Sequence, residues 1–191
     1  MTDTFNWLNP PPAWSGDTSG LTFTTGERTD FWRETHYGFV RDSGHAWLAP
    51  AEGDLTLSAR FQAGYTTLYD QAGLMLRRDD AAWIKTGIEF TDGLMHFSVV
   101  VTGPRSDWSV IPLPGTTTDA WITARLTRRS DAVLIDFRVD DGPWQIARLA
   151  PFPAGRALAG ITACSPERAG LEVRFEDIRL GPPVDRPLHT D

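Results

Sequence analysis

The stretch "AAWIKTGIEFTDG", residues 81–93, alternates apolar and other side chains along its length. Successive side chains of a β-strand point to opposite faces. One face would carry Ile84, Thr86, Ile88 and Phe90, and the other would carry Trp83, Lys85, Gly87 and Glu89. We therefore predict a strand with a core face and a polar aromatic face, closed by the Asp92-Gly93 hairpin turn.

The same alternation returns along most of the chain. It is clearest in "DLTLSARFQ" (54–62), "AGLMLRR" (72–78), "LMHFSVVVT" (94–102), "WITARLTR" (121–128), "AVLIDFRVD" (132–140) and "LEVRFEDIRL" (171–180). No segment keeps an apolar stripe at helical spacing for three turns. This pattern predicts an all-β fold of about a dozen strands, a jelly-roll sandwich of two antiparallel sheets. We expect a single domain over residues 1–180 and a loose tail over residues 181–191, which are rich in proline.

Composition excludes several classes of function. The 191 residues are 41% hydrophobic and carry a net charge of −7, which disfavours nucleic-acid backbones and anionic membranes as partners. We expect no metal, because the four histidines are scattered, and no cofactor, because phosphate-binding and dinucleotide motifs are absent. Cys164 is the single cysteine, predicted to be a buried and unreactive thiol. The start of the sequence lacks the pattern of a secretion signal, so a cytoplasmic location is expected.

Aromatic and polar residues gather in four places. They are "TDFWRETHYGF" (29–39), "YDQAGLML" (69–76), the stretch quoted above and "SDWS" (106–109). In residues 69–76, alternation places Ala72, Leu74 and Leu76 inward, which leaves Gln71, Gly73 and Met75 on the other face. If this strand neighbours residues 83–90, Gln71 shares one surface with Trp83, Lys85 and Glu89.

These clusters also carry a family resemblance. The strings "NPPPAW" (9–14), "TDFWRETHYGF", "YDQAGLMLR" (69–77), "WIKTGIEF" (83–90), "VVVTGPRSDWS" (99–109) and "ACSP" (163–166) resemble the family named for regulation of enolase. That family is a domain of unknown function in the concanavalin A-like lectin/glucanase superfamily, with related domains at the C-termini of some β-xylosidases. The resemblance implies a jelly roll whose concave sheet often faces carbohydrate in relatives. The matching positions, taken as candidates for one site, are Asp30, Trp32, Arg33, His36, Tyr37, Asp70, Gln71, Trp83, Lys85, Glu89, Ser106, Asp107 and Trp108.

Three hypotheses of function follow, of which the favoured one is a non-catalytic domain that binds a sugar or sugar-like ligand. Trp32, Trp83 and Trp108 would stack on the ligand. Its hydroxyls would bond to Asp70, Gln71, Lys85, Glu89 and Asp107. The alternative without a binding role is that the strand face carrying Lys85 and Glu89 is exposed to solvent and that His36 is structural.

The second hypothesis is a glycoside hydrolase with Glu89 as one carboxylate. Such enzymes need two carboxyl groups about 5–5.5 Å apart for retention or about 6.5–9.5 Å apart for inversion. The Glu-x-Asp-x-Glu strand motif of many glucanases is absent, because Lys85 and Gly87 occupy its first positions. The second acid would have to be Asp70, Asp107 or Glu34. A third hypothesis, which rests on the family name, is a regulatory protein partner of a metabolic enzyme.

Overall fold

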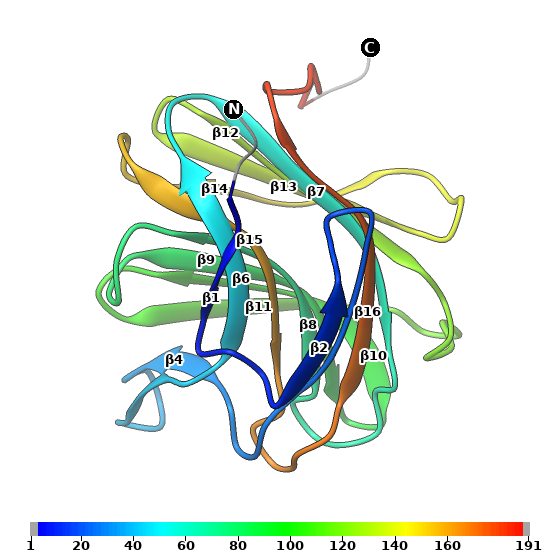
Figure 1. Ribbon diagram of the computed structural model, residues 1–191. Coiled ribbons are helices and arrows are strands. Elements are labelled where there is room, and N and C mark those ends of the chain that lie inside the picture. Colours follow the sequence, from blue (N-terminus) through cyan, green and yellow to red (C-terminus); the bar gives the residue numbers. More distant parts are fainter. Residues whose placement is uncertain (1–3, 189–191) are drawn as a thin grey trace.

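The computed structural model describes residues 4–188 and shows two antiparallel sheets stacked face to face (Figure 1). Sheet A contains, in spatial order, β1 (Asn6–Leu8), β6 (His45–Ala51), β15 (Ala157–Cys164), β8 (Gln71–Arg77), β9 (Trp83–Thr91), β10 (Leu94–Thr102) and β11 (Ser106–Pro112). Sheet B contains β14 (Gln145–Pro151), β13 (Ala132–Val139), β12 (Ile122–Arg129), β7 (Leu55–Ala63), β16 (Glu172–Gly181), β3 (Gly20–Thr24) and β2 (Ala13–Gly16). The predicted all-β jelly-roll sandwich is confirmed, with sixteen strands in the described residues.

The main core lies between the two sheets and follows the predicted alternation. Ile84 and Ile88 of β9, together with Leu74 and Leu76 of β8, belong to one buried apolar cluster with the inward side chains of sheet B. Phe97 of β10 stacks on a phenylalanine of β13. The register that pairs β8 with β9 and β9 with β10 places all these side chains on the inner face of sheet A.

A second, smaller core covers part of the outer face of sheet A. A separate two-stranded hairpin, β4 (Phe31–Arg33) and β5 (Val40–Asp42), lies outside the stacked sheets (Figure 1). Phe31 is fully buried there against Trp83, with ring centroids 6.1 Å apart. The other buried members of this cluster are Ala46, Leu48, Met75, Val100 and Cys164. The hairpin therefore covers the part of the outer face of β8 and β9 that carries Met75 and Trp83.

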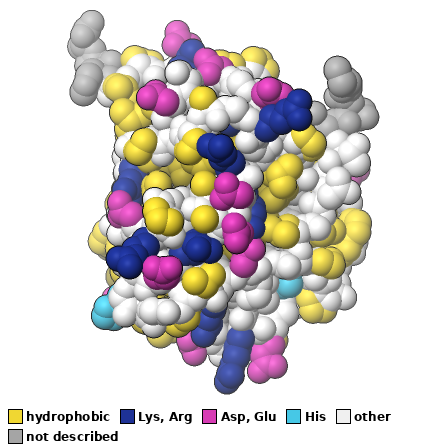
Figure 2. All heavy atoms as spheres, turned by 90° about the vertical axis from the view of Figure 1, so that its left-hand side faces the viewer, with side chains coloured by type: hydrophobic (Ala, Val, Ile, Leu, Met, Phe, Trp, Pro, Cys, Tyr) yellow, Lys and Arg dark blue, Asp and Glu magenta, His cyan; other side chains and the backbone are white. Residues whose placement is uncertain are grey.

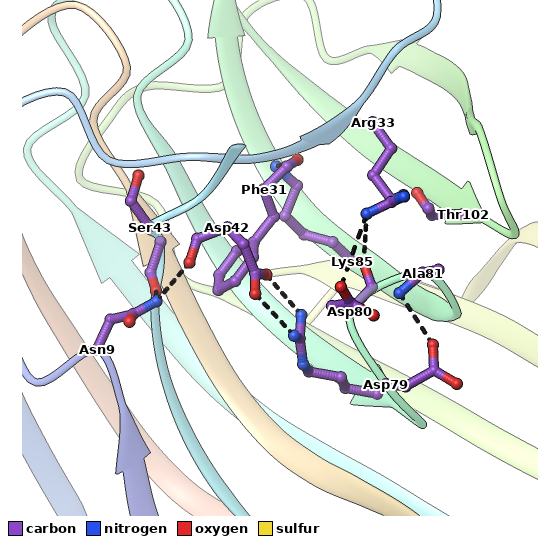
Figure 3. Close-up of polar contacts among 12 residues, drawn as sticks. Asn9, Phe31, Arg33, Asp42, Ser43, Asp79, Asp80, Ala81, Lys85 and Thr102 are labelled. Carbon is purple, nitrogen blue, oxygen red and sulfur yellow. Dashed lines mark hydrogen bonds and ion pairs between the residues drawn. The ribbon is translucent and has the colours of Figure 1, made fainter. Parts of the chain in front are cut away.

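Ion pairs and hydrogen bonds fix the hairpin to the sandwich (Figure 3). Asp42 accepts two hydrogen bonds from the Arg77 guanidinium, at 2.7 and 2.8 Å, and its carbonyl accepts one from Asn9 at 2.8 Å. At the other strand, Arg33 donates to the Asp80 carbonyl at 3.3 Å. The Arg33 backbone N–H also donates to Ser106 Oγ at 2.9 Å. The hairpin is thus anchored at both of its strands.

Two glycines allow β8 and β9 to approach beneath this hairpin. Gly73 and Gly87 are directly paired in the register, and Gly87 has a φ of 151°. A Cβ atom on Gly73 would collide with the Thr86 carbonyl oxygen, and one on Gly87 would collide with the Ala72 carbonyl oxygen. The two glycines are therefore explained by the close contact of the two backbones.

The segment after β16 returns to sheet B. Val184 N–H donates to Thr56 Oγ1 at 2.9 Å, and Arg186 lies 3.3 Å from the Asp136 carboxylate. These contacts hold the first part of the segment expected to be a loose tail, whereas its residues 189–191 lie outside the described residues. Within residues 4–188 the structure contains no helix with the length and apolar character needed to cross a membrane. Figure 2 shows acidic, basic and apolar side chains interspersed over one face of the molecule.

Candidate functional site

A cavity of about 250 Å³ lies over the outer face of sheet A, beside the β4–β5 hairpin. Strands β8, β9, β10 and β11 supply one side of it, and the hairpin and two loops supply the rest. Its lining residues are Asp30, Trp32, Tyr37, Phe39, Arg41, Tyr69, Gln71, Lys85, Glu89, Val100, Trp108, Pro166 and Glu167. The cavity thus combines five aromatic side chains with a set of charged and amide groups.

Lys85 forms a buried ion pair in the cavity. Its Nζ donates to Asp30 Oδ1 at 3.2 Å and to the Phe31 carbonyl at 3.1 Å, so it joins β9 to the start of the hairpin. Burial favours the neutral amine, but the charges of Asp30 and other neighbours outweigh it and raise the Lys85 pKa above its ordinary value. The amine therefore stays protonated at neutral pH and acts as a cation and donor, not as a nucleophile. An ammonium group has three N–H donors, and two are used by these partners.

Glu89 lies two residues from Gly87 on the same face of β9 and is only 4% exposed. Ser98 Oγ donates to its Oε2 at 3.1 Å, and Trp108 Nε1 donates to Ser98 Oγ at 3.2 Å. Burial raises the pKa of Glu89 above its ordinary value, against the opposing effects of Lys85 and the Ser98 hydrogen bond. The chain of hydrogen bonds from Trp108 through Ser98 to Glu89 fixes the carboxyl group on the floor of the cavity.

Gln71 sits directly across from Glu89 in the register of β8 and β9. It is 8% exposed and lines the cavity. Its side-chain amide makes no hydrogen bond within residues 4–188 and is open to the cavity. A bound molecule or water in the cavity would satisfy it.

Aromatic side chains from two loops form the opposite wall. Tyr37, at the tip of the hairpin, contacts Tyr69 through their hydroxyl groups, 3.0 Å apart, and stacks on Phe39 at 5.3 Å. That hydrogen bond, with burial and nearby charges, raises the Tyr69 pKa to about 12. Arg41 lies over the Phe39 ring at 4.5 Å. The contact between Tyr37 and Tyr69 closes the hairpin tip against the loop before β8.

Tyr69 adopts a left-handed conformation, with a φ of 63°, that a bulky residue rarely adopts. The next residue, Asp70, is fully buried and accepts hydrogen bonds from Arg168 and from the backbone N–H groups of Thr66 and Thr67. This network holds the loop and so sets the position of Tyr69. Such strain is concentrated at functional sites in proteins.

The structure brings together about half of the candidate residues. Those that line the cavity are Asp30, Trp32, Tyr37, Gln71, Lys85, Glu89 and Trp108. Trp83 does not, which corrects the prediction that it offers a stacking surface: it is 1% exposed and packs in the small core against Phe31. Alternation placed Trp83 on the correct face but gave no sign of the hairpin that covers it.

Four other candidates lie outside the cavity. Arg33 and Ser106 anchor the hairpin, and Ser106 Oγ also lies 2.8 Å from Thr102 Oγ1. Asp70 is sealed beneath the loop by Arg168, and its burial excludes contact with a ligand. His36 lies at the exposed hairpin tip, edge-on to Tyr37, and lines a separate shallow hollow.

The acids predicted to accompany Glu89 in a hydrolase are all engaged elsewhere. Asp70 pairs with Arg168 and Asp107 pairs with Arg148, each at 2.6 Å, and Glu34 pairs with Arg105 at 3.0 Å. None of the three lines the cavity. The carboxylates that share the cavity with Glu89 are Asp30 and Glu167, which corrects that part of the hydrolase hypothesis.

Several lining residues were not predicted: Phe39, Arg41, Tyr69, Val100, Pro166 and Glu167, together with Ser98 behind Glu89. Alternation along β10 could have found Ser98 and Val100, since Phe97 and Val99 are core residues. For one lining residue that was predicted, Lys85, the composition gave a further indication. Lys85 is the only lysine, and the other basic residues are all arginine. Residues 4–188 hold no cluster of three or more groups able to bind a metal ion.

Comparison with known proteins identifies the family. The sequence matches the family described as "Protein of unknown function (DUF1349)" over residues 7–183. The chain belongs to the DUF1349 family. A curated relative named "Regulation of enolase protein 1", from Saccharomyces cerevisiae, is 43% identical over 184 residues, which cover 96% of this chain and 92% of the relative.

Solved structures support the fold of this DUF1349 protein. A crystal structure of a functionally unknown protein from Saccharomyces cerevisiae is 42% identical, with a TM-score of 0.89 over 95% of this chain and 98% of that one. Bacteroides ovatus Xyloglucan PUL GH43B is 18% identical, with a TM-score of 0.63 over 82% of this chain but only 31% of that chain. The second similarity confirms the two-sheet β-sandwich fold and extends to one part of that larger protein.

Proposed function

We propose that this DUF1349 protein binds a small sugar or sugar-like ligand in the cavity over sheet A. The observation that carries this proposal is the combination, in one cavity, of exposed aromatic surface with polar groups whose hydrogen-bonding capacity is only partly used. Trp108 is 43% exposed at its edge, while Gln71 and Lys85 retain unused hydrogen-bonding capacity at its floor. Sugar sites need this combination, because a sugar ring has apolar C–H faces and a rim of hydroxyl groups.

The test is calorimetric titration with a panel of methyl glycosides and short oligosaccharides. Trp108→Ala should weaken binding by about tenfold or more, since it removes an aromatic contact surface. Trp14→Ala is the matched control, because Trp14 is 49% exposed but lies on β2 at the edge of sheet B. Absence of binding to every member of the panel, or equal losses in both variants, would contradict the proposal.

A glycoside hydrolase is the second candidate, favoured by one observation. The pKa of Glu89 is raised by burial, which suits a general acid, and Asp30 supplies a second carboxylate in the same cavity. Asp30 is, however, engaged by Lys85 and by the Phe31 N–H. Hydrolysis of chromogenic glycosides that is abolished by Glu89→Gln, with binding retained, would establish this function in place of simple binding.

The name of the yeast relative suggests a third candidate, a regulatory contact with a metabolic enzyme. The binding proposal is compatible with it, since a sugar-loaded domain can act on a protein partner. Titration of the purified protein into enolase, with and without sugar, would test that contact directly.

A further inference from the structure

The cavity floor contains three side chains whose hydrogen-bonding groups are only partly used. The Gln71 amide makes no hydrogen bond within residues 4–188 and is open to the cavity, and Glu89 is bonded by Ser98 at Oε2, with the Trp108 indole also acting on it as a donor. Lys85 has one N–H left after Asp30 and Phe31. Gln71 and Glu89 face each other on adjacent strands, where opposed Cβ atoms are about 5 Å apart.

The unused hydrogen-bonding groups of the floor are better suited to bind a pair of ligand hydroxyls than a single charged group of a ligand. A hydroxyl both donates and accepts, and so does an amide. The Glu89 carboxylate accepts hydroxyl hydrogens on the same floor. Two hydroxyls on adjacent ring carbons could therefore each find complementary partners between Gln71 and Glu89.

The charges of the cavity disfavour an anionic ligand at this floor. Asp30, Glu89 and Glu167 line it against two cations, Lys85 and Arg41. The Lys85 charge is already compensated by Asp30 at 3.2 Å, and Arg41 lies on the hairpin over Phe39. A ligand carboxylate or phosphate at the floor would be desolvated beside the Asp30 and Glu89 carboxyl groups, and Arg41, the lining cation without an ion pair in residues 4–188, belongs to the hairpin and not to the floor.

Resting on the proposed sugar-binding function, we propose that Gln71 and Glu89 determine specificity, and that the cavity selects an uncharged sugar with two adjacent free hydroxyls over acidic sugars. Lys85 supplies one further donor to the same hydroxyls. Rejection of acidic sugars is then a property of the floor rather than of the net charge of the protein.

The experiment is calorimetric titration of the full chain with matched ligands. The neutral probes are methyl glycosides of glucose, galactose, mannose and xylose, and the acidic probes are the corresponding uronates and 6-phosphates. We expect the best neutral probe to bind at least about tenfold tighter than its acidic counterparts. Gln71→Ala should weaken it by about tenfold, and this loss should vanish for the monodeoxy probe that lacks the contacted hydroxyl.

Gln71→Met, which keeps the side-chain volume, is the second variant, and Gln145→Ala on exposed β14 is the matched control. Thermal unfolding of each variant verifies that it is folded. Acidic probes that bind as tightly as neutral ones, or unchanged binding in both Gln71 variants, would overturn this inference while leaving the sugar site standing. Failure of every probe to bind would overturn the proposed function itself.

Discussion

Replacing Lys85 by methionine should destabilise the protein strongly. The Lys85 and Asp30 side chains are 7% and 12% exposed, and their charged atoms lie 3.2 Å apart. The variant keeps most of the side-chain volume but leaves the Asp30 carboxylate with only the Phe31 N–H as a partner. Removing one member of a buried ion pair costs about 3–5 kcal/mol, because the remaining charge is desolvated without compensation.

Urea denaturation followed by tryptophan fluorescence measures this loss directly. For a chain of this size, a loss of about 3–5 kcal/mol corresponds to a fall of about 6–20 °C in the melting temperature. Converting Asp30 to asparagine in the same chain should recover part of the loss, since no unpaired charge then remains. Arg179→Met is the control, because Arg179 and Asp177 form an exposed pair, with an expected effect of about 1 kcal/mol or less.

A Lys85→Met variant that loses less than about 1 kcal/mol would refute this reasoning. It would mean that the hairpin rearranges to expose Asp30, or that water reaches the ion pair freely. Equal stability of the single and double variants would refute the explanation in terms of an unpaired charge.

Three further outcomes are expected. Cys164 is fully buried and burial raises its pKa to about 12, so thiol reagents should modify it only after denaturant is added; rapid labelling of the native protein would contradict this. Glu89 has a raised pKa in the folded state, so its contribution to the free energy of unfolding falls as pH rises above the ordinary glutamate range. Glu89→Gln should therefore gain stability relative to the wild type with rising pH, and parallel pH profiles would exclude this. Arg77→Met should destabilise the hairpin contact with Asp42 and weaken ligand binding together, whereas intact binding would show that the hairpin does not need this anchor.

The fold could be predicted from the sequence because alternation is a local property. Each strand shows its own inner face, so Ile84 and Leu74 were assigned to the core without knowledge of their neighbours. The pairing of Gln71 with Glu89 was also reachable, since both strands are adjacent in the chain and joined by a short connection.

The cavity was predicted less well, because the hairpin that covers part of the sheet is distant from β8 and β9 in the sequence. Trp83 and Lys85 share one face of β9, yet Trp83 is buried beneath Phe31 whereas Lys85 lines the cavity. This difference is set by a hairpin more than forty residues earlier in the chain. The pairings of Asp70 with Arg168 and of Asp107 with Arg148 join residues 98 and 41 positions apart, so alternation gave no sign of either.

The presence of a single lysine permits a direct test of ligand binding in the cavity. Protein labelled with ¹³C-lysine gives one ε-methylene signal in an NMR spectrum, and that signal reports on the cavity floor. Titration with the best-binding neutral glycoside should shift it saturably, with the same affinity that calorimetry gives, and Trp108→Ala should weaken both in parallel. A glycoside that binds while the Lys85 signal stays unchanged would contradict the claim that this cavity is the site.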